Sequence, residues 1–249
     1  MKLKHDWEDL AKVDAFWAIL SDPSKTHGRW DVADFFLTGE QEIEMVMSDA
    51  QKLGYPRKRE VALDFGCGLG RLTRALAKHF GHAYGLDISE TMINRARELN
   101  ESFANCSFVL NTEPNLRGFQ SGSFDLTYCN LVLMHLPSIA LIESYLSEFI
   151  RTLRVGGLLR FQLPTRIPMP YRIQPRRRLY SVLRDMGFNE RFLMERLKLT
   201  PIRMSFVPKQ RVIDFLSLIG GHLLEIEEQS MGPSGIRTAM YSVTKAEMN

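Results

Sequence analysis

Alternating glycines between two aspartates mark the part of the sequence best suited to chemistry. Residues 61–76 read VALDFGCGLGRLTRAL, an apolar run followed by one acid and three glycines: Asp64, Gly66, Gly68 and Gly70. Glycine tolerates positive φ angles and lets a ligand approach the backbone, so this spacing predicts a ligand-binding loop between a strand and a helix. Asp87 ends the next apolar run, 21 residues after Gly66, where its carboxylate can accept hydrogen bonds from both hydroxyls of a ribose.

The spacing of these glycines separates two classes of nucleotide ligand. The loop follows GxGxG, whereas loops that bind a pyrophosphate follow GxGxxG, so a dinucleotide is the weaker interpretation. A tight turn without any ligand is a third interpretation, because many strand-to-helix connections use glycine. We interpret Cys67, inside the loop, as a small filler, since the predicted chemistry does not require a thiol.

A further candidate for chemistry follows the fourth apolar run, at 124–129. His135 would face a substrate at the edge of the sheet and could accept a proton from a hydroxyl or an amine. The alternative is a histidine that only packs or hydrogen-bonds, because the sequence reveals no partner for it. No metal site is expected, since the three cysteines are widely spaced and lack any CxxC.

The elements that position these residues alternate between short apolar runs and helical patterns. Strands are predicted at 61–65, 83–87, 107–110, 124–129, 158–163, 222–228 and 237–244. Helices are predicted at 6–20, 40–53, 71–80, 90–100, 139–153 and 209–219, with Gly156 and Gly157 as the stop of the fifth. Because crossovers are right-handed, we expect a doubly wound, Rossmann-like, mostly parallel α/β sheet. The short turn at 230–235 requires the last two strands to pair antiparallel.

Composition places the chain in an ordinary class. Its 249 residues, 45% of them apolar and 24% charged, suit one globular domain with an embedded subdomain. The first residues contain acids and do not form a secretory signal, and no run approaches the roughly 18 apolar residues that span a bilayer. We therefore expect a cytoplasmic protein with reduced thiols and no membrane span.

Taken together, these motifs resemble the class I S-adenosylmethionine-dependent methyltransferases. The resemblance rests on the loop DFGCGLGR at 64–71, on GLDIS at 85–89 and on FDLTYCNLVLMH at 124–135, and it covers residues 60–163. It implies a seven-stranded sheet whose last strand inserts antiparallel. It also implies S-adenosyl-L-methionine as cofactor and S-adenosyl-L-homocysteine as product.

The resemblance assigns roles to individual residues. The glycine loop would wrap the methionine part of the cofactor, and this group comprises Asp64, Gly66, Cys67, Gly68 and Gly70. The ribose and adenine would be held by Asp87, Ile88, Ser89, Met92, Thr112 and Glu113, and the sulfonium region by Asn130 and Leu131. Thr112 departs from the family pattern, because relatives place an acid there.

The resemblance also suggests four segments. These are an N-terminal helical cap (1–57), the cofactor-binding core (58–165), a basic Pro/Arg-rich insertion that forms a lid or an interface (166–206), and a closing helix and hairpin that complete the sheet (207–249). Residues 166–211 carry twelve Arg or Lys against three acids. The arginine run that begins at Arg176 could be a solvated helix start, a reader of a carboxylate or phosphate, or a contact for RNA or an anionic membrane.

The cap and the insertion would supply the substrate side. The candidate substrate residues are Trp17, Trp30, Phe35, Tyr171 and Arg176, although the aromatic ones could equally form subdomain core. We expect methyl transfer to an oxygen or nitrogen of a small organic acceptor. The alternatives are a non-catalytic protein that binds the cofactor and an RNA methyltransferase. The negative charge outside the insertion disfavours nucleic acid as a partner, and the sequence does not set the oligomeric state.

Overall fold

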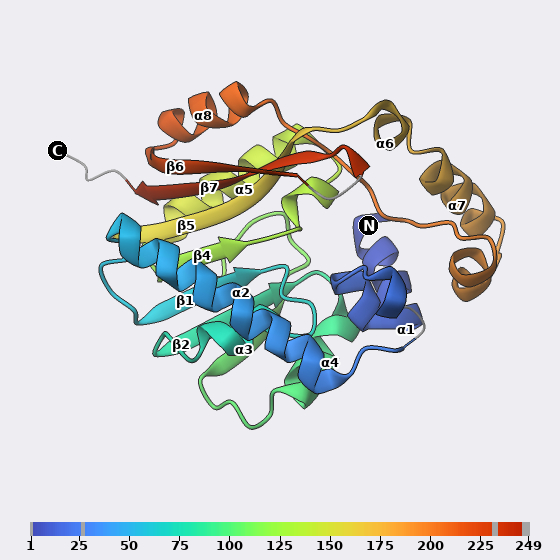
Figure 1. Ribbon diagram of the computed structural model, residues 1–249, viewed down its shortest axis with the longest axis horizontal. Coiled ribbons are helices and arrows are strands. Elements are labelled where there is room, and N and C mark those ends of the chain that lie inside the picture. Colours follow the sequence, from blue (N-terminus) through green and yellow to red (C-terminus); the bar gives the residue numbers. More distant parts are fainter. Residues whose placement is uncertain (1, 26–27, 231–233, 246–249) are drawn as a thin grey trace.

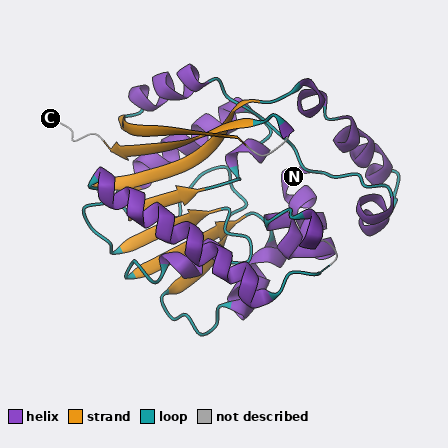
Figure 2. Ribbon diagram, viewed as in Figure 1, coloured by secondary structure: helices purple, strands orange, loops and turns teal. Residues whose placement is uncertain are grey.

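The fold is organised around one seven-stranded sheet with helices on both faces (Figures 1 and 2). In the computed structural model, residues 2–25, 28–230 and 234–245 are described. The strand order is β3-β2-β1-β4-β5-β7-β6, and β7 pairs antiparallel with both of its neighbours. The order reverses between β1 and β4, which opens a crevice at the carboxyl ends of these strands. The expected doubly wound sheet with an antiparallel last strand is confirmed.

The strands lie close to their predicted positions. They are β1 (Val61–Phe65), β2 (His82–Asp87), β3 (Cys106–Leu110), β4 (Phe124–Cys129), β5 (Leu153–Arg166), β6 (Gly221–Ser230) and β7 (Arg237–Lys245). The helices are α1 (Lys2–Ile19), α2 (Val32–Leu53), α3 (Arg71–Leu76), α4 (Glu90–Leu99), α5 (Ile139–Thr152), α6 (Met169–Ile173), α7 (Pro175–Asp185) and α8 (Lys209–Leu218). Residues 231–233 of the predicted turn at 230–235 lie outside the described residues.

Several predictions about the elements were wrong. Helix α3 ends at Leu76 and not at residue 80, and β5 begins at Leu153 and not at residue 158. Helix α2 begins eight residues earlier than expected because Asp31 caps it, accepting a hydrogen bond from the Asp34 backbone. Helix α5 ends at Thr152 without help from Gly156, whose φ of +77° lies inside β5. The insertion is also more regular than its prolines indicated, since it contains α6, α7 and a π-helical turn at Phe192–Arg196.

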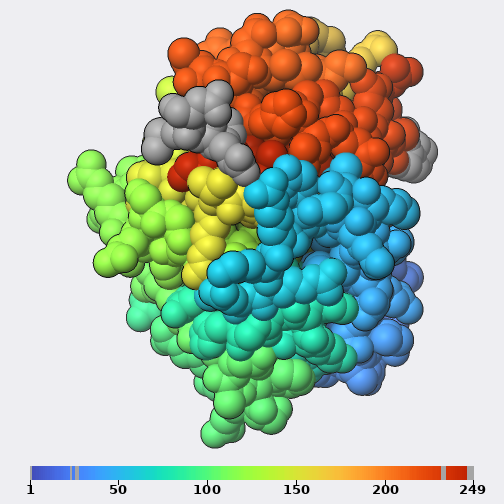
Figure 3. Space-filling model, turned by 90° about the vertical axis from the view of Figure 1, so that its left-hand side faces the viewer, coloured from blue at the N-terminus to red at the C-terminus, as the bar shows by residue number. Residues whose placement is uncertain are grey.

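Alternate residues of the central strands pack on opposite faces of the sheet. On β1, Leu63 and Phe65 join the core beneath α5 and α8, whereas Ala62 joins the core beneath α2 and α3. Both faces of the sheet are therefore buried, as expected for a doubly wound fold. Figure 3 shows the end of the molecule where the end of α2 (light blue) and α8 (orange) lie at the surface.

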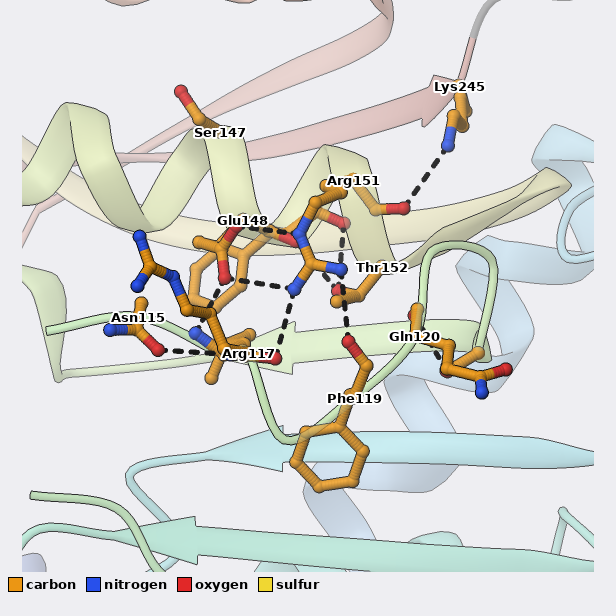
Figure 4. Close-up of polar contacts among 12 residues, drawn as sticks. Asn115, Arg117, Phe119, Gln120, Ser147, Glu148, Arg151, Thr152 and Lys245 are labelled. Atoms are coloured by element: carbon orange, nitrogen blue, oxygen red, sulfur yellow. Dashed lines mark hydrogen bonds and ion pairs between the residues drawn. The ribbon is translucent and has the colours of Figure 1, made fainter. Parts of the chain in front are cut away.

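An ion pair on α5 holds the loop that follows β3. Arg151 donates to Glu148 on the next turn back and to the carbonyl oxygens of Leu116 and Phe119, while Glu148 accepts from the Leu116 backbone at 2.6 Å (Figure 4). Tyr145 donates to the carbonyl of Glu113 at 3.0 Å. These bonds fix the connection between β3 and β4 beside the crevice.

Helices α1 and α7 form a cap beyond the carboxyl ends of the strands (Figure 1). Asp9, 6% exposed on α1, accepts a hydrogen bond from Tyr180 at 2.9 Å and pairs with Arg184 at 3.0 Å. Asp6 lies 3.6 Å from Arg177. The N-terminal segment and the insertion are therefore joined through polar contacts. Among the described residues, no helix is long and apolar enough to cross a membrane.

Candidate active site

A cavity of about 440 Å³ opens at the carboxyl edge of the sheet, where the strand order reverses. Its floor comes from the loops after β1, β2 and β4. Its roof comes from α1 and from the chain that returns from the insertion. The lining is mostly apolar, with Asp87, Arg71, Asn111, Asn130 and His135 as its main polar members. Within the described part of the chain, no group of three or more metal-ligating side chains is found.

The glycine loop forms one wall of the cavity, and the backbone of its glycines does not accommodate a side chain. Gly66, Gly68 and Gly70 have φ angles of +81°, +53° and +83°, the region that favours glycine. A Cβ on Gly66 would clash with Val132, and one on Gly68 would lie 2.5 Å from the Cδ1 atom of Ile19. The amides of Gly66 and Cys67 donate to the Leu86 carbonyl at 2.7 and 2.9 Å, which ties the loop to β2.

Asp87 is held rigidly at the end of β2. One of its carboxylate oxygens accepts from the Gly68 amide and the other from the Ser89 amide, both at 2.9 Å. Burial raises the pKa of Asp87, against the lowering effect of these backbone donors. Each oxygen accepts one amide bond and retains acceptor capacity toward the cavity that Asp87 lines. The pair of oxygens can therefore take two vicinal hydroxyls.

Asp64 lies beneath the glycine loop and does not line the cavity. Its carboxylate is 1% exposed and accepts from the Thr73 hydroxyl at 2.7 Å. Burial raises its pKa to about 7, and the hydrogen bond from Thr73 only partly opposes this effect. The free protein thus contains a desolvated acid directly under the loop.

A polar network from α2 reaches the cavity beside Asp64. Glu42 accepts from Arg71 at 2.7 Å, from Tyr128 at 3.0 Å and from the Asn130 side-chain amide at 2.8 Å. Arg71 is 4% exposed, and both Arg71 and Asn130 line the cavity. The Oδ1 atom of Asn130 is buried and has no partner among the described residues. An orphaned acceptor of this kind requires a donor, such as the amine of a ligand.

The chain directly after β4 carries local strain. Leu131 has a φ angle of +59° and lines the cavity next to Asn130. A non-glycine residue in this region costs about 1 kcal/mol or more and tends to occur at functional sites. The strained turn directs this segment across the end of the strand.

His135 is fixed by one hydrogen bond and one ring contact. Its Nδ1 atom lies 2.6 Å from the carbonyl oxygen of Arg203. A carbonyl only accepts, so Nδ1 carries the proton and Nε2 is left as an acceptor. The Trp7 ring packs edge-on at 5.4 Å between centroids. Burial lowers the pKa of His135, which keeps the ring neutral.

The cavity brings together many, but not all, of the residues predicted to bind the cofactor. Those that line it are Gly66, Cys67, Gly68, Asp87, Ile88, Met92, Asn130 and Leu131. Those that do not are Asp64, Gly70, Ser89, Thr112 and Glu113. Ser89 caps α4 by accepting from the Met92 amide, and Asn111, directly before Thr112, takes the place in the wall after β3.

None of the predicted substrate residues lines the cavity. Trp17, Trp30, Phe35, Tyr171 and Arg176 all lie elsewhere. Phe35 is fully buried against Phe16 and Trp30, so it forms subdomain core, as the alternative interpretation proposed. Tyr171 and Arg176 are exposed on the insertion.

Sequence reasoning missed several residues of the wall. The missed residues include Arg71, Asn111, Leu3, Trp7, Phe65, Tyr145, Ile202 and Met204. The apolar spacing of the first helix could have indicated Trp7, and the inward face of the fifth could have indicated Tyr145. Ile202 and Met204 lie in an irregular segment, where the sequence has no periodic signal.

Comparison with known proteins identifies the domain that contains this cavity. Residues 63–161 match the family described as "Methyltransferase domain". This part of the chain is similar to methyltransferase domains. Over 102 residues, it is 35% identical to a phosphoethanolamine N-methyltransferase from Triticum aestivum. Over 101 residues, it is 36% identical to a ubiquinone biosynthesis O-methyltransferase from Methylococcus capsulatus.

These alignments cover 40% of this chain, and 20% and 41% of the two relatives. The similarity is therefore confined to this region, and the chain spans less than half the length of either relative. Solved structures have a similar fold over nearly the whole of this chain. Magnesium protoporphyrin IX methyltransferase from Synechocystis, crystallised with bound SAH, superposes with a TM-score of 0.60 at 19% identity, covering 97% of both chains. The N-methyltransferase NodS from Bradyrhizobium japonicum gives 0.62 at 16% identity, covering 99% and 100%.

The cavity fits S-adenosylmethionine on three observations. Asp87 offers two oxygens for the ribose, the glycine loop excludes side chains, and the orphaned Asn130 Oδ1 needs a donor such as the cofactor's amine. Arg71, on the same wall, can face the cofactor's carboxylate. His135 lines the same cavity.

Proposed function

We propose that the protein transfers a methyl group from S-adenosylmethionine to an oxygen or nitrogen of a small organic acceptor. The observation that supports this most is one cavity that joins the cofactor contacts at Asp87 to a neutral histidine under an apolar roof. When bound, the sulfonium cofactor supplies an activated methyl group for direct displacement. The domain then has to align the acceptor and exclude water.

Positioning of the cofactor would fall to residues fixed before it binds. The amides of Gly68 and Ser89 donate to the two carboxylate oxygens of Asp87 and fix their position. Glu42 fixes Arg71 and Asn130 by accepting a hydrogen bond from each. Because these groups are ordered by the protein itself, binding costs little further ordering. The roof from α1 would shield the reacting atoms from water.

His135 would act as the base. With its proton on Nδ1, the Nε2 atom can take a proton from an acceptor hydroxyl or ammonium as the new bond forms. Lowering of its pKa by burial keeps this nitrogen available at neutral pH. Trp7 and the Arg203 carbonyl would hold the ring at a fixed angle.

The acceptor would be apolar or aromatic on at least one side. The roof and far wall consist of Leu3, Trp7, Leu136, Ile202 and Met204. Such a wall binds a molecule by excluding water and does not offer charges for a polymer backbone. We also propose that the protein is cytoplasmic and does not bind nucleic acid.

The test is formation of S-adenosylhomocysteine across a panel of small phenols, amines and carboxylates. His135→Gln should lower turnover by about 100-fold or more while the dissociation constant for S-adenosylhomocysteine stays within about twofold. His222→Gln, an exposed histidine on β6, is the matched control and should change neither quantity. Equal turnover of the His135 variant and the control would remove the base assignment.

The pH dependence of kcat/KM tests independently whether His135 is the base. A base works unprotonated, so kcat/KM should rise with pH and level off above a midpoint that lies below 6.5, the ordinary pKa of histidine. This limb should be absent from the His135→Gln variant. Cofactor binding without turnover on any acceptor would favour a non-catalytic cofactor-binding protein. Turnover on RNA alone would favour an RNA methyltransferase.

A further inference from the structure

Helix α7 presents its apolar side to solvent. Leu179, Val182 and Met186, spaced by three and four residues, are 49%, 55% and 69% exposed. Residues at this spacing share one face of a helix. In a globular protein that face normally turns toward the core. On α7 this stripe faces solvent, although Tyr180 and Leu183 on the inner side pack with Leu193 and Leu199.

The inner face of α7 attaches the helix to the rest of the chain. The helix is attached to the body by polar groups: Tyr180 and Arg184 contact Asp9, and Arg177 contacts Asp6 and the Pro201 carbonyl. Tyr180 is the one buried residue of α7. The helix is therefore held by polar bonds and by the packing of Tyr180, and its outward stripe is exposed among the described residues.

Neighbouring parts of the insertion share this property. Among the described residues, nine of the fourteen large apolar side chains that are exposed fall between 169 and 197. Besides the stripe on α7 they are Met169, Tyr171, Ile173, Phe188, Phe192 and Leu197. An exposed apolar patch of this kind marks an interaction site. Figure 1 places α6 and α7 at the outer rim of the molecule, outside α1.

Charge indicates which partner fits this patch. Residues 166–198 contain nine Arg or Lys and three acids, a net charge of +6. Two of the acids, Glu190 and Glu195, already pair with Arg184 and Arg191. Arg176 and Arg178 flank the apolar stripe on α7 and are exposed. The surface thus combines aliphatic side chains with unneutralised positive charge.

We propose that α6, α7 and the turn after them form a docking surface for an anionic lipid bilayer. An amphipathic helix with basic residues beside an apolar stripe lies in the bilayer interface, where the aliphatic groups enter the acyl region and the arginines meet anionic headgroups. A second copy of the chain fits less well, because an isologous contact would oppose two blocks of like charge. RNA would leave the aliphatic stripe exposed, since it is bound through phosphates and stacked bases.

This surface goes beyond the proposed function and adds a route for the acceptor. The chain leaving the insertion supplies Ile202 and Met204 to the cavity wall, so the docking surface and the apolar roof belong to one cap. The cavity could then receive an acceptor that is dissolved in the bilayer. The docking itself does not require turnover, so it can be tested apart from the proposed activity.

The experiment is flotation of the full chain with vesicles, in the absence of cofactor. Vesicles of phosphatidylcholine with about 30% phosphatidylglycerol should bind the protein at least about tenfold better than pure phosphatidylcholine. Raising the salt from about 0.05 to about 0.5 M should weaken this binding several-fold, because the arginines are exposed and screened.

Two matched pairs of variants separate the apolar and charged contributions. L179S/V182S/M186S should weaken vesicle binding about tenfold or more, whereas M45S/V155S/L218S, which alters three apolar residues 64%, 56% and 79% exposed on other elements, should stay within about twofold of wild type. R176Q/R178Q should weaken binding about threefold or more, whereas K58Q/R117Q should not. All five positions on α7 are exposed, and thermal melts would verify that the variants fold.

Several outcomes would overturn the inference. One is the absence of binding to the anionic vesicles, and another is equal loss in the two apolar triple variants. A dimer that L179S/V182S/M186S converts to a monomer would assign the patch to self-association. Vesicle binding without methyl transfer would support the docking surface and count against the proposed function alone.

Discussion

Replacing Asp64 with asparagine should make the stability of the protein less dependent on pH. In the folded protein, burial raises the pKa of this carboxyl to about 7, against 3.8 for a free aspartate. The folded state therefore holds the proton more tightly than the unfolded state does. It follows that this group's contribution to stability is lost as pH rises from about 4 to about 7.

The magnitude follows from the size of that shift. A difference of about 3 pKa units corresponds to about 4 kcal/mol, at about 1.4 kcal/mol per unit. Part of this difference is already present at pH 5, and relaxation around a buried charge lowers such values, so we expect the Asp64→Asn substitution to recover about 2 kcal/mol at pH 8 relative to pH 5. The amide oxygen can still accept from Thr73, as the carboxylate does at 2.7 Å.

Urea unfolding at pH 5 and pH 8 measures this directly. The difference between wild type and the asparagine variant cancels the other titrating groups, including His135 and Asp87. Parallel pH dependences in the two proteins would refute the argument that Asp64 is a desolvated acid. The same variant should bind S-adenosylhomocysteine more weakly if the cofactor's amine offsets the charge on Asp64.

Two further substitutions test the walls of the site. Gly66→Ala should weaken binding of S-adenosylhomocysteine at least tenfold in calorimetry, because its φ is +81° and a Cβ would clash with Val132; an unchanged affinity would contradict the close-approach argument. Glu42→Gln should cost about 3 kcal/mol in urea unfolding, because it leaves Arg71 charged at 4% exposure. The control Glu44→Gln replaces a 70% exposed glutamate on the same helix, 3.3 Å from His79, and should cost under about 0.5 kcal/mol. Equal losses in the two variants would show that the Glu42 pair is not special.

The order and type of the core elements could be predicted because their apolar patterns are strong. The strands at 61–65 and 124–129 were placed to the residue, since both are buried runs bounded by clear turns. The antiparallel closing pair followed from the short connection alone. Bounds failed where local signals compete, as at Gly156, where a glycine that resembles a helix stop instead serves the start of β5.

The floor of the site was predictable and its roof was not. Gly66, Gly68 and Asp87 belong to one contiguous motif at the carboxyl ends of two adjacent strands, so local sequence is enough to locate them. Trp7 and Met204 reach the cavity from segments about 200 residues apart, and only the packing of α1 against the insertion brings them together. Aromatic type alone pointed to Phe35, which the fold instead buries.

The central claim is that the ends of β1 and β2 bind an adenosyl sulfonium through the glycine loop and Asp87. Titration calorimetry with S-adenosylhomocysteine tests it most directly. Wild type should bind, and Asp87→Ala should bind about tenfold or more weakly, since bonds to a charged group contribute about 1.5–3 kcal/mol. The Asp185→Asn control, at an exposed acid on α7, should leave affinity unchanged. Equal affinities in all three proteins, or binding of a nicotinamide dinucleotide in place of this ligand, would contradict the account.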